Sequence, residues 1–227
     1  MNFLNYFSRD EDERARFIFN LIAPVYGLID RGVSENYRKI IDRLNEIIPL
    51  EGLTVLDVGT GTGGWITALN RYPLKNAVGV DFSEKMIRQA RKNHPEIRFE
   101  VSDGKDLSLF ADDSFDLVTC SFVMHGMKRE LRREVLKEMF RVARQAVVVH
   151  DFHDRLAWPT RLLESLERSD WKNFLQSFEE EMKEYTPAVQ IVTVNRGNGL
   201  YVGKKSKSGK SQKVDWLRAQ GTGLRER

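Results

Sequence analysis

Cysteine is nearly absent from this sequence, with Cys120 as its one thiol among 227 residues. An internal disulfide framework and a zinc site built from cysteines are therefore excluded, and a reducing, cytoplasmic setting is the expectation. The chain also has no apolar run long enough to span a membrane. Residues 1–10 lack the basic region followed by an apolar one that marks a secretory signal, so none is expected.

A strong net charge is also missing from most of the chain, because basic residues gather near its C-terminal end. Residues 204–227 hold five Lys and three Arg against Asp215 and Glu226, which is +6, so the overall +3 leaves −3 on the rest. Such a tail is typical of a disordered terminus, and it can also contact nucleic acid or an anionic surface.

Residues 53–71 have the pattern of a strand, a glycine-rich turn and a helix. The apolar run Leu53–Val58 contains a single acid, Asp57, and leads into the glycine loop 59–64 and the helical stretch 65–71. This order opens a nucleotide-binding βαβ unit. Its glycines let the backbone approach a ligand closely, and its helix presents free N–H groups to that ligand.

The glycine spacing fits two kinds of site. Gly59, Gly61 and Gly64 match the G-x-G-x-x-G of dinucleotide sites, whereas Asp57 with the loop also matches D-x-G-x-G-x-G. A carboxylate here would repel a pyrophosphate but suits the sulfonium and ammonium groups of S-adenosyl-L-methionine (SAM). The stretch resembles motif I of the class I SAM-dependent methyltransferases. This resemblance implies that the methionine part of SAM is held by Asp57, Gly59, Thr60, Gly61 and Gly63.

The next expected strand, residues 77–80, ends in Asp81. A carboxylate at the tip of the second strand can accept hydrogen bonds from both ribose hydroxyls, in NAD enzymes as well as in SAM enzymes. Ser83 is a plausible N-cap for the helix that follows. The pattern Val-Gly-Val-Asp-x-Ser-x-x-Met is common in class I methyltransferases, and the resemblance adds Phe82 and Met86 to the expected cofactor contacts.

The expected third strand, residues 97–101, is followed by Asp103 and Gly104. In the family this Asp approaches the adenine amino group, and the next backbone N–H approaches a ring nitrogen. An acceptor beside a donor matches the edge of adenine. The alternative is an ordinary turn, since Asp-Gly is common turn chemistry.

The expected fourth strand, residues 115–120, leads into the loop 121–127 at its carboxyl end, where ligands bind in open α/β sheets. The Ser121-Phe122 pair resembles the quinone-biosynthesis C-methyltransferases, in which this Ser touches SAM. His125 is the candidate catalytic base, because an unperturbed imidazole titrates near neutrality. Pocket lining and a purely structural loop role are the alternatives for His125.

The segment 19–34 also resembles the entry of the quinone-biosynthesis C-methyltransferases, F-x-x-I-A-x-x-Y-D-x-x-N…S. Gly27 and Asp30 stand where that pattern has Asp and Asn. The resemblance implies that Tyr26 is a lid residue over SAM, and a half-buried aromatic at a helix end is the alternative.

The remaining chain is expected to complete an α/β domain. A helix over 128–143 precedes a buried strand at 146–149, and polar residues follow, of which Asp151 or His153 could contact substrate. No metal site is expected. Six basic residues in and after that helix are assigned to its solvated face: Arg129, Arg132, Arg133, Lys137, Arg141 and Arg144. A solvated face is also expected for the acidic run 179–181, and a β-hairpin for 189–203.

These patterns predict an α/β, Rossmann-like fold with a seven-stranded, mostly parallel sheet, a terminal antiparallel hairpin and flanking helices. The expected parts are a helical lid (1–48), a SAM-binding domain (49–203) with a helical insertion (152–188), and the basic tail (204–227). The expected activity is methyl transfer from SAM to a small-molecule acceptor, with S-adenosyl-L-homocysteine as product. Three alternatives remain: an RNA methyltransferase that uses the tail, an NAD-dependent oxidoreductase, and a SAM-binding module without catalysis.

Overall fold

A computed structural model describes residues 37–154, 158, 160–161, 164, 169–195 and 197–205. Tyr26, the rest of the expected lid before residue 37, and the basic tail after residue 205 lie outside these residues. Parts of the expected insertion 152–188 lie outside them as well.

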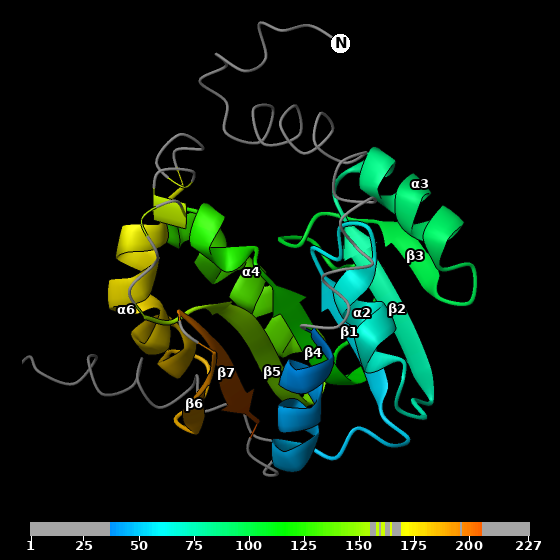
Figure 1. The fold of residues 1–227 in the computed structure, drawn as a ribbon, viewed down its shortest axis with the longest axis horizontal. Coiled ribbons are helices and arrows are strands. Elements are labelled where there is room, and N and C mark those ends of the chain that lie inside the picture. The colour runs from blue at the N-terminus through cyan, green and yellow to red at the C-terminus, as the bar shows by residue number, and fades with distance from the viewer. Residues whose placement is uncertain are drawn as a thin grey trace, which may run out of the picture.

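Seven strands form one sheet in the order β3-β2-β1-β4-β5-β7-β6 (Figure 1). Neighbours from β3 to β5 pair in parallel, whereas β7 runs antiparallel to both β5 and β6. The prediction of a mostly parallel sheet with a terminal antiparallel hairpin is confirmed. The strands are β1 (Thr54–Val58), β2 (Asn76–Asp81), β3 (Arg98–Val101), β4 (Phe115–Ser121), β5 (Ala143–Phe152), β6 (Val189–Asn195) and β7 (Asn198–Lys204).

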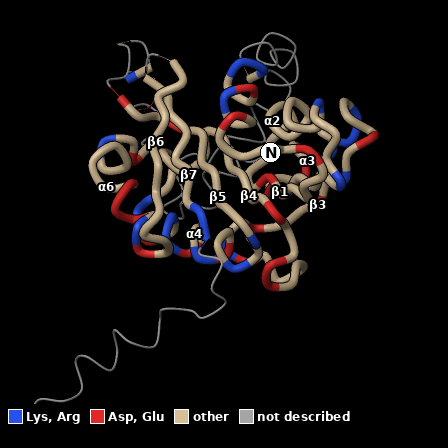
Figure 2. The backbone as a smooth tube through the Cα atoms, turned by 90° about the horizontal axis from the view of Figure 1, so that it is seen from below, with Lys and Arg blue, Asp and Glu red and all other residues tan. Residues whose placement is uncertain are grey.

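Helices cover both faces of the sheet, and in Figure 2 α4 lies on one side of the row of strands and α2 on the other. One core lies between the sheet and the pair α4 and α6, and the second between the sheet and α2, α3 and the helix over 37–47. The labelled helices are α2 (Gly64–Leu69), α3 (Glu84–Asn93), the 3-10 turn η2 (Met124–Gly126), α4 (Arg129–Val142) and α6 (Trp171–Lys183).

Local sequence explains where α3 begins and why β5 is apolar. The Ser83 hydroxyl accepts a hydrogen bond from the Met86 N–H at 3.3 Å, so the predicted N-cap of α3 is confirmed. The centre of β5 is apolar on both faces because both are covered by helices, and Val147 and Val148 are fully buried. Strand β5 begins at Ala143, earlier than expected, since Ala143 pairs with Phe115 of β4.

Two assignments to solvated faces are wrong. Arg132 of α4 and Glu181 of α6 each have an exposed fraction of 0%. The Arg132 guanidinium donates to both Glu181 carboxylate oxygens at 2.9 Å, and its Nη1 donates to Asp170 at 2.9 Å. Ser177 also donates to Glu181. The two helices pack charged positions toward each other, and a bidentate pair satisfies charges that could not be buried alone.

No helix in the described part of the chain is long and apolar enough to cross a bilayer.

Replacing Arg132 by Ala should lower the free energy of unfolding by about 3–5 kcal/mol, because the fully buried Glu181 loses both guanidinium hydrogen bonds and keeps the Ser177 hydroxyl and, at 3.8 Å, the largely exposed Arg129. Arg133→Ala is the matched control. Its pair with Glu184 is largely exposed, so the loss should stay within about 1 kcal/mol. Denaturant unfolding of both variants measures the difference.

The double variant Arg132→Met with Glu181→Leu removes both charges and should recover most of the stability that Arg132→Ala loses. An Arg132→Ala variant as stable as Arg133→Ala would contradict this account of the α4–α6 contact.

Candidate active site

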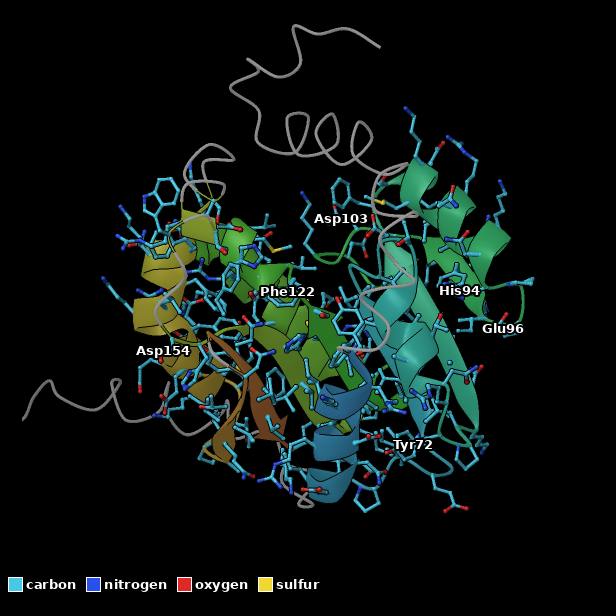
Figure 3. All side chains as sticks on the ribbon, in the orientation of Figure 1. Tyr72, His94, Glu96, Asp103, Phe122 and Asp154 are labelled. Atoms are coloured by element: carbon cyan, nitrogen blue, oxygen red, sulfur yellow. The ribbon has the colours of Figure 1, made fainter. Side chains whose placement is uncertain are left out.

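The candidate site lies at the carboxyl edge of the parallel strands. In Figure 3 Asp103 lies at this edge, and Tyr72, which precedes β2, lies toward the opposite end of the strands. Strands β1 and β4 are neighbours, and the chain leaves them toward opposite flanks of the sheet. This is the switch point at which open α/β sheets bind ligands.

The glycine loop after β1 is built against this edge. Gly61 has a left-handed φ of 56°, and its N–H donates to the Asp81 carboxylate at 2.9 Å, while the Thr60 N–H donates to the Val80 carbonyl at 2.9 Å. A Cβ on Gly61 would meet no atom of the described residues within 4 Å, so these residues leave open space at this point. A Cβ on Gly59 would come within 2.7 Å of the Val123 side chain, so the loop after β4 packs on the glycine loop.

Asp57 is buried below this loop, with an exposed fraction of 1%. The Thr119 hydroxyl of β4 donates to its Oδ1 at 3.0 Å. Burial raises the pKa of Asp57 to about 7, and the hydroxyls of Thr60 and Thr119 only partly oppose this rise. No Lys, Arg or His of the described ranges is paired with Asp57, so the site holds a carboxylate that a bound cation would stabilise.

Asp81 links three segments of the site. Its Oδ1 accepts the Ser83 N–H at 2.8 Å, its Oδ2 accepts the Gly61 N–H, and its carbonyl accepts the Ser102 N–H at 3.1 Å. Burial raises the pKa of Asp81, and the two N–H donors counteract that rise. Each carboxylate oxygen has a second lone pair, so Asp81 can still accept hydrogen bonds from a ligand diol.

The other expected cofactor residues follow β2, β3 and β4. Met86 is buried in α3, and Phe82 is half-buried beside Asp81 in the sequence. Asp103 follows β3 as expected, and its Oδ1 accepts the Lys105 N–H at 3.2 Å, which makes the Asp103-Gly104 stretch a real turn as well as a candidate adenine contact. Ser121 ends β4, and a 3.0 Å hydrogen bond joins its hydroxyl to Nδ1 of His150.

The backbone is strained directly after Ser121. Phe122 has a φ of 53°, which is costly for a bulky side chain, and its N–H donates to the His150 carbonyl at 2.9 Å. Its ring packs edge-on against those of His150 and Phe152, with centroids 4.6 and 5.5 Å apart. Strain of this kind gathers at functional sites.

His125, the expected catalytic residue, lies in η2 at the same edge. Its Nδ1 is 2.7 Å from Asp151 Oδ1, and its Nε2 is 3.4 Å from Glu164 Oε2. The sequence predicts a substrate contact for Asp151 or His153, and it does not suggest Glu164 as a site residue. Because side chains alternate between the two faces of a strand, the sequence could have placed Asp151 on the same face of β5 as Val149. Which residue Asp151 contacts on that face depends on tertiary packing.

His150 is a residue that the sequence did not single out. Its ring stacks on that of Trp65 with centroids 5.0 Å apart, and Tyr37 packs edge-on against both rings. Burial lowers the pKa of His150 to about 4, so this imidazole stays neutral near pH 7.

Cys120 is a buried residue of β4. Burial raises the pKa of the Cys120 thiol well above its ordinary value, so Cys120 is an inert core residue. Within the described residues, no group of three or more His, Cys, Asp or Glu side chains is arranged to hold a metal ion.

The candidate site lies in a segment that is similar to a known domain. A family model described as a methyltransferase domain matches residues 55–146, which hold the glycine loop, Asp81, Asp103 and His125. The fold agrees with that of the PH0226 protein from Pyrococcus horikoshii OT3, with a TM-score of 0.63, 25% identity, and coverage of 76% of this chain and 90% of that one. The chain has the fold of the class I methyltransferases.

Two relatives and a further solved structure are also similar to this chain. Demethylmenaquinone methyltransferases of Roseiflexus sp. (strain RS-1) and Thermotoga maritima are 33% and 34% identical over 147 and 139 residues, covering 61% and 59% of this chain. The matches span 60% and 58% of those relatives, less than two thirds of their length. Magnesium protoporphyrin IX methyltransferase from Synechocystis PCC 6803 shares the fold alone, with a TM-score of 0.59, 17% identity, and coverage of 77% of this chain and 84% of that one.

The raised pKa of Asp57 predicts how stability changes with pH. Between pH 3.8 and about pH 7 the Asp57 carboxyl binds a proton more tightly in the folded protein than in the unfolded chain. Protonated Asp57 therefore stabilises the fold at low pH, and this contribution is lost as the pH rises through that interval. Asp57→Asn cannot titrate. The melting temperature of the variant minus that of the wild type should therefore increase from about pH 5 to about pH 8.

Thermal unfolding of both ligand-free proteins over this pH range tests the prediction, with the exposed carboxylate variant Asp112→Asn as control. A constant difference between wild type and Asp57→Asn would mean that Asp57 is ionised throughout.

Proposed function

We propose that this chain transfers the methyl group of SAM to a nucleophile on a small-molecule acceptor. The observation that carries the proposal is the joint placement of Asp57, the glycine loop and Asp81 at the carboxyl edge. A buried carboxylate that no described Lys, Arg or His pairs with lies next to a loop where the described residues leave open space at Gly61. This combination suits a ligand that has an ammonium group and a ribose.

The cofactor roles follow from position. Asp57, Gly59, Thr60, Gly61 and Gly63 hold the methionine part, with Ser121 approaching it from β4. Asp81 accepts hydrogen bonds from the ribose hydroxyls. Asp103 and the Gly104 N–H meet the adenine edge, and Phe82 and Met86 line the same region. Tyr26 stays a proposal from the sequence, as a lid residue.

Bound SAM supplies a methyl group on a positively charged sulfur, which is already a good leaving group. The protein therefore needs to align the acceptor, exclude water and take up the proton that the acceptor loses. The position of His125, just after β4 and 2.7 Å from Asp151 of β5, supports it for the last task. The aromatic rings of Phe122 and Phe152 favour a planar, apolar acceptor.

A demethylmenaquinone-type acceptor is the finer form of the proposal. It is supported by the two demethylmenaquinone methyltransferases described above and by the Ser121-Phe122 pair. Acceptor screening with SAM labelled in its methyl group, with demethylmenaquinone in the panel, tests this form. Label transfer to another small molecule would keep the methyltransferase and replace the acceptor.

Calorimetric titration tests the cofactor. Wild-type protein should bind SAM with micromolar affinity and should not bind NAD, because a pyrophosphate would lie against Asp57. Asp81→Ala should weaken SAM binding by about tenfold or more, since it loses the acceptor for the ribose hydroxyls. Asp112→Ala, which removes an exposed carboxylate, is the control. Binding of NAD in place of SAM would refute the proposed function.

A pair of glycine variants tests the position of the cofactor. Gly61 and Gly52 both have a left-handed φ, at 56° and 75°, and at either position an added Cβ would meet no atom within 4 Å in the part of the chain that the structure describes. Alanine should cost each about 1–2 kcal/mol of stability from backbone strain. Only Gly61→Ala should also weaken SAM binding, because its methyl group enters the cofactor space. Equal SAM affinity in the two variants would move the cofactor away from Gly61.

A further inference from the structure

The ring of His125 lies between two carboxylates that come from distant parts of the chain. Asp151 belongs to β5 and is fully buried, and Glu164 belongs to the helical part of the insertion. The side chains of His125 and Glu164 are 12% and 7% exposed. The three groups therefore form a largely dry cluster, in which electrostatic interactions are stronger than in water.

Asp151 holds His125 by two atoms. Its Oδ1 lies 2.7 Å from Nδ1 of the ring, and its Oδ2 accepts the backbone N–H of His125 at 3.2 Å. The same Oδ1 accepts the Phe152 N–H at 2.8 Å, which anchors the carboxylate to its own strand. An ionised carboxylate can only accept hydrogen bonds, so Nδ1 carries a proton and Nε2 of the neutral ring has a lone pair.

The contact on the other side of the ring is longer. Nε2 and Glu164 Oε2 are 3.4 Å apart, whereas a charge-assisted bond would be about 2.7–2.9 Å. Oε2 is buried and accepts no hydrogen bond from the described residues. At 3.4 Å the pair is close enough for charges to interact, although it is not a hydrogen bond. A proton on Nε2 would give the ring a positive charge beside this carboxylate.

Other contacts hold the ring and its loop in place. The Ser169 hydroxyl donates to the His125 carbonyl at 3.1 Å. The rings of Phe152 and Phe122 pack against the imidazole with centroids 4.5 and 6.3 Å away. The ring thus has little freedom to turn, and the identity of the proton-accepting nitrogen is set by the surrounding side chains.

We propose that Asp151 and Glu164 are positioning residues that act through His125 in the proposed methyl transfer. Asp151 selects the tautomer in which Nε2 accepts a proton, and Glu164 stabilises the imidazolium that results. A bond forms between the nucleophilic atom of the acceptor and the methyl carbon, while the bond from that carbon to sulfur breaks and its electron pair stays on sulfur. The proton of the acceptor passes to Nε2.

Glu164 favours this step selectively. Its contact with a neutral ring is weak, whereas a protonated ring would be attracted to its negative charge. An interaction that strengthens only as the reaction proceeds lowers the barrier instead of merely tightening binding. The inference rests on the proposed function, and its test is chosen so that each can fail without the other.

Nitrogen NMR of the imidazole rings tests the inference without any acceptor. The chain has four histidines, so His125→Gln assigns the His125 signals directly. The wild-type protein should show His125 with Nδ1 protonated and Nε2 unprotonated above its titration midpoint. Asp151→Asn should remove this tautomer preference and lower the midpoint by about one pH unit or more. Glu164→Gln should keep the tautomer and lower the midpoint.

Asp154→Asn is the matched control, because it removes a carboxylate just after the same strand, and it should leave the His125 signals unchanged. An Nε2-protonated tautomer in the wild type would overturn the inference, as would a midpoint that neither Asp151→Asn nor Glu164→Gln changes. The wild-type tautomer and Glu164→Gln decide the outcome if Asp151→Asn fails to fold.

Calorimetric titration of the same samples with SAM separates the two proposals. Intact SAM binding together with an Nε2-protonated His125 would contradict only the roles of Asp151 and Glu164. A wild-type protein that does not bind SAM would contradict the proposed function. The variants His125→Gln, Asp151→Asn and Glu164→Gln should each bind SAM as the wild type does, since none of these three residues is assigned to the cofactor.

Discussion

The carboxylate of Asp81 is the interaction on which the candidate cofactor site depends. It receives one N–H from the glycine loop after β1 and another from the start of α3, and its own carbonyl receives an N–H from the turn after β3. Three segments that would contact methionine, ribose and adenine are thereby held in one arrangement. The loops can be glycine-rich and still ordered, because a single buried side chain satisfies their backbone donors.

Burial shifts the pKa values of two groups at this edge in opposite directions. It raises the pKa of Asp57 to about 7 and lowers that of His150 to about 4, because burial disfavours the charged form of each group. Near pH 7 the ligand-free site therefore has a neutral His150 and a partly protonated Asp57. A cationic cofactor would reverse the cost for Asp57, whereas His150 would remain a neutral partner of Ser121.

The acceptor side depends on a second buried pair. Arg132 donates to Glu181, to Asp170 and to the Met127 carbonyl, so it connects α4, α6 and the end of the loop that contains His125. Ser169, next to Asp170, donates to the His125 carbonyl. The insertion and the loop after β4 are thus held together by a charge network. Such a network adds little net stability over an apolar core, but breaking it is costly, which makes it suited to specifying one arrangement of the two segments.

The order of strands and helices, the glycine turn, the N-cap at Ser83 and the acids at or just after the carboxyl ends of β1, β2 and β3 could all be predicted from the sequence. Each depends on short-range chemistry: apolar runs, turn residues and spacings that put a side chain at a strand end. The partners of Arg132 and His125 could not be predicted. Glu181 is 49 residues from Arg132 and Asp151 is 26 from His125, and α4 has five basic residues with nothing in their spacing to mark the buried one. The sequence by itself determined the sheet and the cofactor edge, whereas only the tertiary structure decided which charges are buried and which carboxylates lie beside the ring of His125, because long-range pairing depends on how α4, α6 and β5 pack.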